Sequence, residues 1–310
     1  MVQPVFAMLT YLLRILGCAL GVVIGSVLGG MLFAALGLPG PQMPAAVDTR
    51  LLALSSLVGG VVLSIGLAEI ARRLRGSFWT RWLIVGWFAY GCLGINNTIE
   101  ASIFTSIGGS LALAVLWLVA CLISACLITL LFRNPTPAEP FGASVRLFFA
   151  GRTWGQWAWR LFAAWLAFPV VYFVFGMPVG LLVQHAYREQ AFGLRLPGLE
   201  VVIAVQLVRS IVFLLVALPV FVAWSGLRRR LNLIFGLSLF IVLGLYGLIQ
   251  AYWLPWSMRG LHTVEILLDS LVYGWLLVSL LVPRATPPSI PLPLAAANGD
   301  VQGVAAGTES

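Results

Sequence analysis

The feature that most constrains this chain is a series of eight long apolar runs, each close to the length of a membrane-spanning helix. A helix needs about 20 predominantly apolar residues to cross the hydrocarbon core of a bilayer. The runs lie at residues 12–37, 51–71, 79–95, 105–132, 158–183, 201–225, 231–253 and 262–282. Only 9% of the residues are charged, whereas a soluble domain has about 25%. We therefore expect an all-α membrane protein with eight transmembrane helices that contacts the lipid bilayer.

The distribution of arginine predicts how these helices are oriented. All 18 basic residues are arginine, and short cytoplasmic loops carry an excess of basic residues. With the N-terminus inside, 13 arginines fall on the cytoplasmic side and 5 on the outer side. We expect both termini to be cytoplasmic, in a plasma or inner membrane. The basic charge is thus a topology signal, and no nucleic-acid partner is expected.

Four regions follow from this topology. Residues 1–135 form a first four-helix membrane half, and residues 136–157 a cytoplasmic interfacial linker. Residues 158–282 form a second four-helix half. Residues 283–310, which are rich in proline and alanine and lack apolar periodicity, are expected to be a disordered cytoplasmic tail.

A tetrapeptide that occurs once in each half suggests an internal duplication. Asn97-Thr98-Ile99-Glu100 and His262-Thr263-Val264-Glu265 each follow a basic turn and one apolar run. Because each half has an even number of spans, such repeats would be parallel and related by an axis along the membrane normal.

The spacing after the two tetrapeptides does not match. The cytoplasmic Arg133 lies 33 residues after Glu100, but Arg284 lies only 19 residues after Glu265. The fourth helix must therefore protrude, tilt or break, and Gly108-Gly109 is the expected break.

The candidate functional residues form a polar stripe in the last apolar run. His262, Glu265 and Asp269 are spaced i, i+3 and i+7, which places them on one helical face. Ionisable residues inside a membrane span are costly and are usually functional. A histidine with two carboxylates could bind a divalent metal ion or relay protons. Further candidates for a substrate or proton site are Asn97, Glu100, Arg209, Gln250 and Arg259.

Structural explanations compete with this functional one. Asn97 and Glu100 have the spacing of a helix capping box. The stripe on the last helix could instead make polar contacts between helices or form a water-facing cap. Arg209 either reaches the interface or pairs with Glu265 or Asp269 inside the protein.

The first apolar run carries Gly17, Gly21, Gly25 and Gly29, spaced by four residues. A stripe of small residues lets a second helix approach closely in a membrane. Tight packing within the chain is the favoured role, and a homodimer contact through the first helix is the alternative.

The sequence leaves three classes of function open. The best supported is a transporter of small solutes or ions with an outward-facing polar site. A membrane-embedded, metal-dependent enzyme and a non-catalytic scaffold or assembly protein are the alternatives. An enzyme is less favoured because the polar residues do not complete a recognisable catalytic set.

Overall fold

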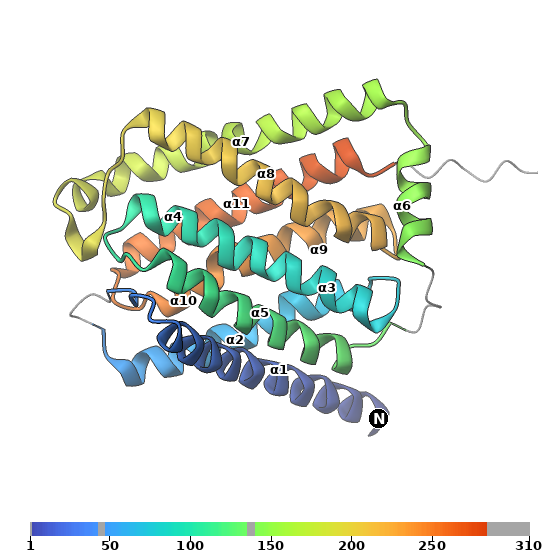
Figure 1. Cartoon of the computed structure of the whole chain (residues 1–310), viewed down its shortest axis with the longest axis horizontal. Helices are drawn as coiled ribbons and strands as arrows, with labels where there is room; N and C mark the ends of the chain where they lie inside the picture. Colours follow the sequence, from blue (N-terminus) through green and yellow to red (C-terminus); the bar gives the residue numbers. More distant parts are fainter. Residues whose placement is uncertain (1, 43–46, 135–139, 284–310) are drawn as a thin grey trace, which may run out of the picture.

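The computed structural model describes residues 2–42, 47–134 and 140–283, and it is a bundle of helices aligned along one axis (Figure 1). Seven of the helices are long and apolar enough to cross a membrane. These are α1 (Val2–Ala35), α2 (Thr49–Ala71), α5 (Ser110–Leu131), α7 (Trp154–Arg188), α8 (Leu199–Ala223), the continuous helix Arg228–Gln250 and α11 (Trp256–Leu281). The chain is therefore a multi-pass helical membrane protein.

The segment expected to be the third of eight spans is also helical. It consists of α3 (Phe78–Ala89), the π-helical η1 (Tyr90–Asn96) and α4 (Asn97–Phe104), which follow one another without a break. The eight-span topology that this segment would complete stays a prediction, as does the cytoplasmic location of the termini. The expected tail lies outside the described residues apart from Pro283.

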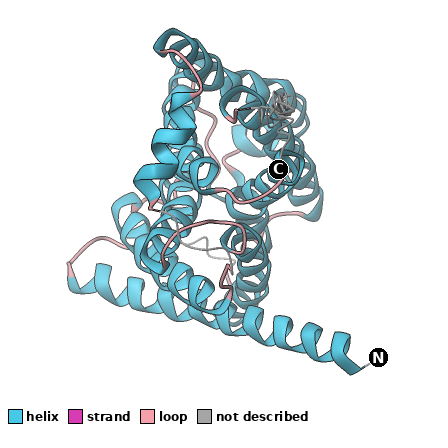
Figure 2. Cartoon of the chain, turned by 90° about the vertical axis from the view of Figure 1, so that its right-hand side faces the viewer, coloured by secondary structure: helices cyan, strands magenta, loops and turns pink. Residues whose placement is uncertain are grey.

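Two short elements lie outside the long helices. The helix α6 (Phe141–Ala150) runs across one end of the bundle, at the right in Figure 1, and η2 (Ala191–Gly193) is a short 3-10 turn after α7. Figure 2 looks at the bundle from the α6 end and shows α1 extending beyond the other helices.

Local capping and turn residues set the helix boundaries, and some of these differ from the expected ones. The break at Gly108-Gly109 is as expected: both residues have positive φ angles, 65° and 62°, and α5 starts only at Ser110. The last helix begins at Trp256, six residues earlier than expected, directly after Pro255. Likewise α7 begins at Trp154, where Thr153 and Gln156 form a capping box.

Two helices contain a π-helical segment that the apolar pattern did not predict. Besides η1, the segment η3 (Ile241–Leu245) connects α9 (Arg228–Phe240) to α10 (Tyr246–Gln250). A π-helix shifts the backbone hydrogen bonds of a helix and is often found at functional sites. Here the Asn97 amide donates to the Leu243 carbonyl of η3 at 3.0 Å, so a side chain from one altered helix bonds to the backbone of the other.

The two halves meet in a reciprocal contact at the arginine-rich end of the bundle. Leu74 and Trp224 form an antiparallel bridge. The Arg75 amide donates to the Ala223 carbonyl, and the Ser225 amide donates to the Arg73 carbonyl, both at 2.7 Å. Three pairs of matching positions are each separated by 150 residues: the starts of α2 and α8, the two bridge residues, and the starts of α3 and α9.

The two tetrapeptides that suggested a duplication do not occupy matching places. Asn97–Glu100 belongs to α4, before the turn that leads into α5, whereas His262–Glu265 belongs to α11, after the corresponding turn. This difference explains the unequal spacing to the next arginine. A duplication of the chain stays a prediction.

The glycine stripe of α1 packs against α5 of the same chain. A Cβ atom added to Gly25 would lie 2.8 Å from the Ala120 Cα, and one added to Gly29 would lie 2.6 Å from the Leu116 carbonyl oxygen. Gly21 faces the Leu127 side chain in the same way, and Gly17 lies near Leu131. The stripe therefore allows the two backbones to come close, and a homodimer through α1 would have to use another face of this helix.

Several arginines at the α6 end cap helices rather than face solvent. Arg81 is buried and donates to the carbonyls of Ala71 and Phe132, where α2 and α5 end. Arg152, Arg160 and Arg228 donate to carbonyls in the last turn of α11. Helix C-termini have unpaired carbonyls, and these side chains satisfy them.

Candidate solute-binding cavity

A cavity of about 430 Å³ lies inside the bundle, between helices of both halves. Its walls come from η1, α4 and α5 of the first half and from α7, α8, α9, η3, α10 and α11 of the second half. The lining residues Thr105, Leu194 and Trp253 lie in the connections α4–α5, α7–α8 and α10–α11, at the end of the bundle opposite the capping arginines. Its aromatic lining residues are Phe104, Trp117, Phe168, Tyr172, Tyr187, Phe213, Tyr246, Trp253 and Tyr273.

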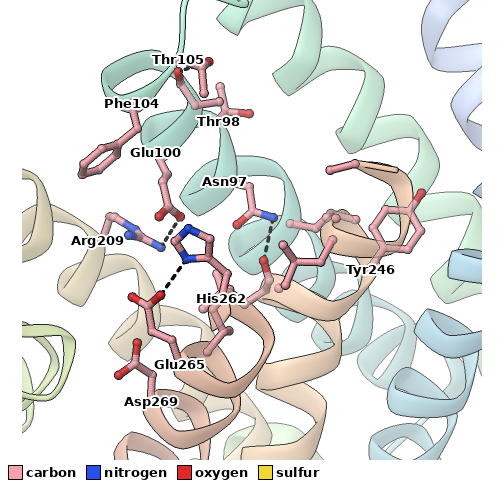
Figure 3. A pocket seen from close by; sticks show the side chains of 18 of the residues that line it. Asn97, Thr98, Glu100, Phe104, Thr105, Arg209, Tyr246, His262, Glu265 and Asp269 are labelled. Carbon is pink, nitrogen blue, oxygen red and sulfur yellow. Dashed lines mark hydrogen bonds and ion pairs between the residues drawn. The ribbon is translucent and has the colours of Figure 1, made fainter. Parts of the chain in front are cut away.

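An ion pair between Glu100 of α4 and Arg209 of α8 joins two residues that line this cavity. The Glu100 Oε2 and an Arg209 guanidinium nitrogen are 2.9 Å apart (Figure 3). The Arg209 side chain is 3% exposed, whereas that of Glu100 is 39% exposed. Arg209 also donates to the Gln206 amide oxygen at 3.1 Å and lies over the ring of Phe168. Of the two alternatives for Arg209, the side chain pairs inside the protein, and its partner is Glu100 rather than Glu265 or Asp269.

The second polar contact joins His262 and Glu265 on α11. The His262 Nδ1 and the Glu265 Oε2 are 2.7 Å apart (Figure 3). The Glu265 carboxylate is held against α7 at Gly176, where an added Cβ would come within 2.8 Å of its Oε1. The absence of a side chain at Gly176 therefore makes room for a carboxylate between two helices.

Asp269 lies one turn further along the same face of α11 and has no partner of this kind. The residue is 7% exposed and lines the cavity. Its Oδ1 is buried and makes no hydrogen bond to any residue that the structure describes. Asp269 is thus a buried acidic group in the cavity lining, and its Oδ1 makes no hydrogen bond within the described chain.

Of the remaining candidates from the sequence, two line the cavity and one does not. Gln250 lines the cavity and donates to the Ser56 hydroxyl at 2.8 Å. Asn97 also lines it, and the alternative explanation of a capping box with Glu100 does not hold, because no side chain caps the start of α4 and the Asn97 amide bonds to η3. Arg259 stacks on Trp256 outside the cavity lining.

The proposed metal ligands do not converge. Among the described residues, no three His, Cys, Asp or Glu side chains lie close enough together to hold a metal ion. His262 and Glu265 bond to each other, and no bond joins Asp269 to either of them (Figure 3). The geometry favours a site made of separate polar contacts over a metal centre.

Four further residues of the site were not predicted from the sequence: Gln206, Gly176, Tyr172 and Tyr187. Gln206 had a usable signal, because an amide three residues before an arginine inside a span is costly unless it has a partner. The tyrosines and Gly176 had no such signal, since aromatic residues and glycine are common in membrane spans.

No protein-family model, curated protein or solved structure matches the chain.

Proposed function

We propose that the protein is a transporter of small solutes that binds its substrate in the cavity between the two halves. The observation that supports this most strongly is the set of ionisable side chains that the cavity brings together inside a membrane protein. Glu100, Arg209, His262, Glu265 and Asp269 come from three different helices. Such groups are expensive in a membrane and commonly mark a pathway for a substrate or ion.

The location of the cavity also supports transport. Secondary transporters with internal repeats bind their substrates near the middle of the membrane, at the interface between the repeats. We propose that the chain has eight spans with both termini in the cytoplasm, and that its halves are parallel repeats. The reciprocal contact between Leu74 and Trp224 and the common separation of 150 residues support this arrangement. In this topology the cavity faces outward.

The proposal is tested by asking from which side of the membrane the cavity can be reached. Thr98 lines the cavity and is replaced by cysteine, a side chain of similar size. A membrane-impermeant methanethiosulfonate reagent is then applied to right-side-out and to inverted vesicles. The modification is irreversible, so modified protein accumulates even if the cavity opens to the second side of the membrane only rarely. A transporter predicts modification of Thr98→Cys from both sides, faster from the outside.

Two controls frame this experiment. The wild-type chain measures the background labelling of the native cysteines, of which Cys18, Cys92 and Cys121 are buried. A Ser64→Cys variant, whose position is 0% exposed, reports on unfolding and should stay unmodified. Modification of Thr98→Cys from one side only, however long the reaction, would identify a static binding cavity and contradict transport.

A further inference from the structure

The charges of the cavity point to the class of its ligand. Three of its lining residues are carboxylates, and the arginine that lines it, Arg209, already pairs with Glu100. Glu265 bonds to His262, so Asp269 is the lining carboxylate that is left to bind a ligand. An acidic group in a site of low polarity needs a positive or hydrogen-donating partner, since burying it alone is costly.

The rest of the lining favours an organic cation over a bare metal ion. The Arg209 guanidinium lies over the rings of Phe168 and Phe213, whereas Tyr172 and Tyr187 line the cavity, are partly exposed and lie under no cation of the described chain. Aromatic faces attract cations, and those that carry alkyl groups also gain from apolar contact. A volume of about 430 Å³ lies in the range of pockets for small organic molecules.

From these observations we infer that the cavity binds an amphiphilic organic cation, with its ammonium group at Asp269 and its apolar body among the aromatic residues. This inference rests on the proposed function, because it names the substrate class of the same cavity. The acidic side chains alone would not support it; the buried carboxylate whose Oδ1 makes no hydrogen bond and the aromatic lining together do.

The test uses three probes that share a phenylalkyl chain and differ in the charge of the head group. (4-Phenylbutyl)trimethylammonium is a permanent cation, 4-phenylbutanol is neutral and 4-phenylbutyrate is an anion. Each is titrated by calorimetry into the full-length protein in nanodiscs, with empty nanodiscs as the blank for partition into lipid. We expect the cation to bind at least about tenfold more tightly than the alcohol, which is ~1.4 kcal/mol, and the anion not to bind.

Asp269→Asn removes the charge and keeps the size of the side chain, so it should reduce binding of the cation to the level of the alcohol. Glu69→Gln is the matched control, because Glu69 pairs with Arg72 and Arg73 near the C-terminal end of α2, away from the cavity. This variant should bind the cation like the wild type. Equal binding of cation and alcohol, or an unchanged affinity in Asp269→Asn, would overturn the inference.

A second measurement covers the case in which Asp269→Asn fails to fold. The cation should slow modification of Thr98→Cys in a saturable way, and 4-phenylbutyrate should not. Equal protection by both probes would also overturn the inference. The two proposals fail separately: two-sided labelling without cation selectivity leaves transport standing, and cation selectivity with one-sided labelling leaves a binding protein.

Discussion

Replacing Gly29 of α1 with alanine tests whether the glycine stripe is a contact within the chain. The added Cβ would lie 2.6 Å from the Leu116 carbonyl oxygen and 2.8 Å from the Leu116 Cα. Both atoms belong to the backbone of α5, so no side chain can rotate away, and the two helices must move apart. The neighbouring Gly30 provides the control, because its added Cβ would meet only the Phe33 ring, at 3.9 Å.

The expected magnitude follows from comparing these two variants. Alanine stabilises a helix relative to glycine by roughly 0.5–1 kcal/mol, and this gain is common to both positions. Overpacking at Gly29 costs about 1–3 kcal/mol in addition. The free energy of unfolding of Gly29→Ala should therefore be about 1–3 kcal/mol lower than that of Gly30→Ala.

Reversible unfolding in sodium dodecyl sulfate, followed by tryptophan fluorescence, measures this difference. The measurement is repeated over a range of protein concentrations. A contact within one chain predicts a difference that does not depend on concentration. Equal stabilities of the two variants would refute the close approach of α1 and α5, and a difference that grows with concentration would instead indicate a homodimer contact.

Two further variants probe the helix ends and the site. Arg81→Met should lower the free energy of unfolding by about 3 kcal/mol or more, because two hydrogen bonds from a charged donor to the carbonyls that end α2 and α5 are lost and each contributes about 1.5–3 kcal/mol. The exposed Arg133→Met should change it by less than about 0.5 kcal/mol, and equal effects in the same unfolding assay would contradict the capping role. Gly176→Ala should displace the carboxylate of α11 from its histidine and be less stable than Gly180→Ala by about 1–3 kcal/mol, since nothing lies within 4 Å of a Cβ at Gly180. Equal unfolding midpoints for this pair would show that the carboxylate moves at no cost.

The apolar runs predicted the helical membrane fold because a spanning helix must satisfy its own backbone and needs a minimum length. The break at Gly108-Gly109 was predictable for a similar reason, since a run of that length would exceed the bilayer. The π-helical segments were not predictable, because η1 and η3 depend on how two helices pack against each other. The same holds for the pairing of Asn97 with Leu243, which the sequence pattern presented as a cap.

The sequence identified candidate residues one by one, but not how they are arranged in the cavity. A charge inside an apolar run is visible in the sequence, and this identified Glu100, Arg209, Glu265 and Asp269. The partner of each charge depends on which helices are neighbours, and the order of residues along the chain does not specify this. The two similar tetrapeptides were misleading for the same reason. One lies before a turn and the other lies after the corresponding turn, so they belong to helices that do not correspond in space.

Exchange of a labelled cation through the reconstituted protein tests the central claim most directly. Proteoliposomes are loaded with unlabelled (4-phenylbutyl)trimethylammonium and diluted into a trace of the radiolabelled cation, and its uptake is followed with time. We expect saturable uptake in the wild type and in Glu69→Gln, and loss of this uptake in Asp269→Asn. Uptake by the wild type that equals that of protein-free liposomes, or that persists in full in Asp269→Asn, would contradict a cation transporter built around this cavity.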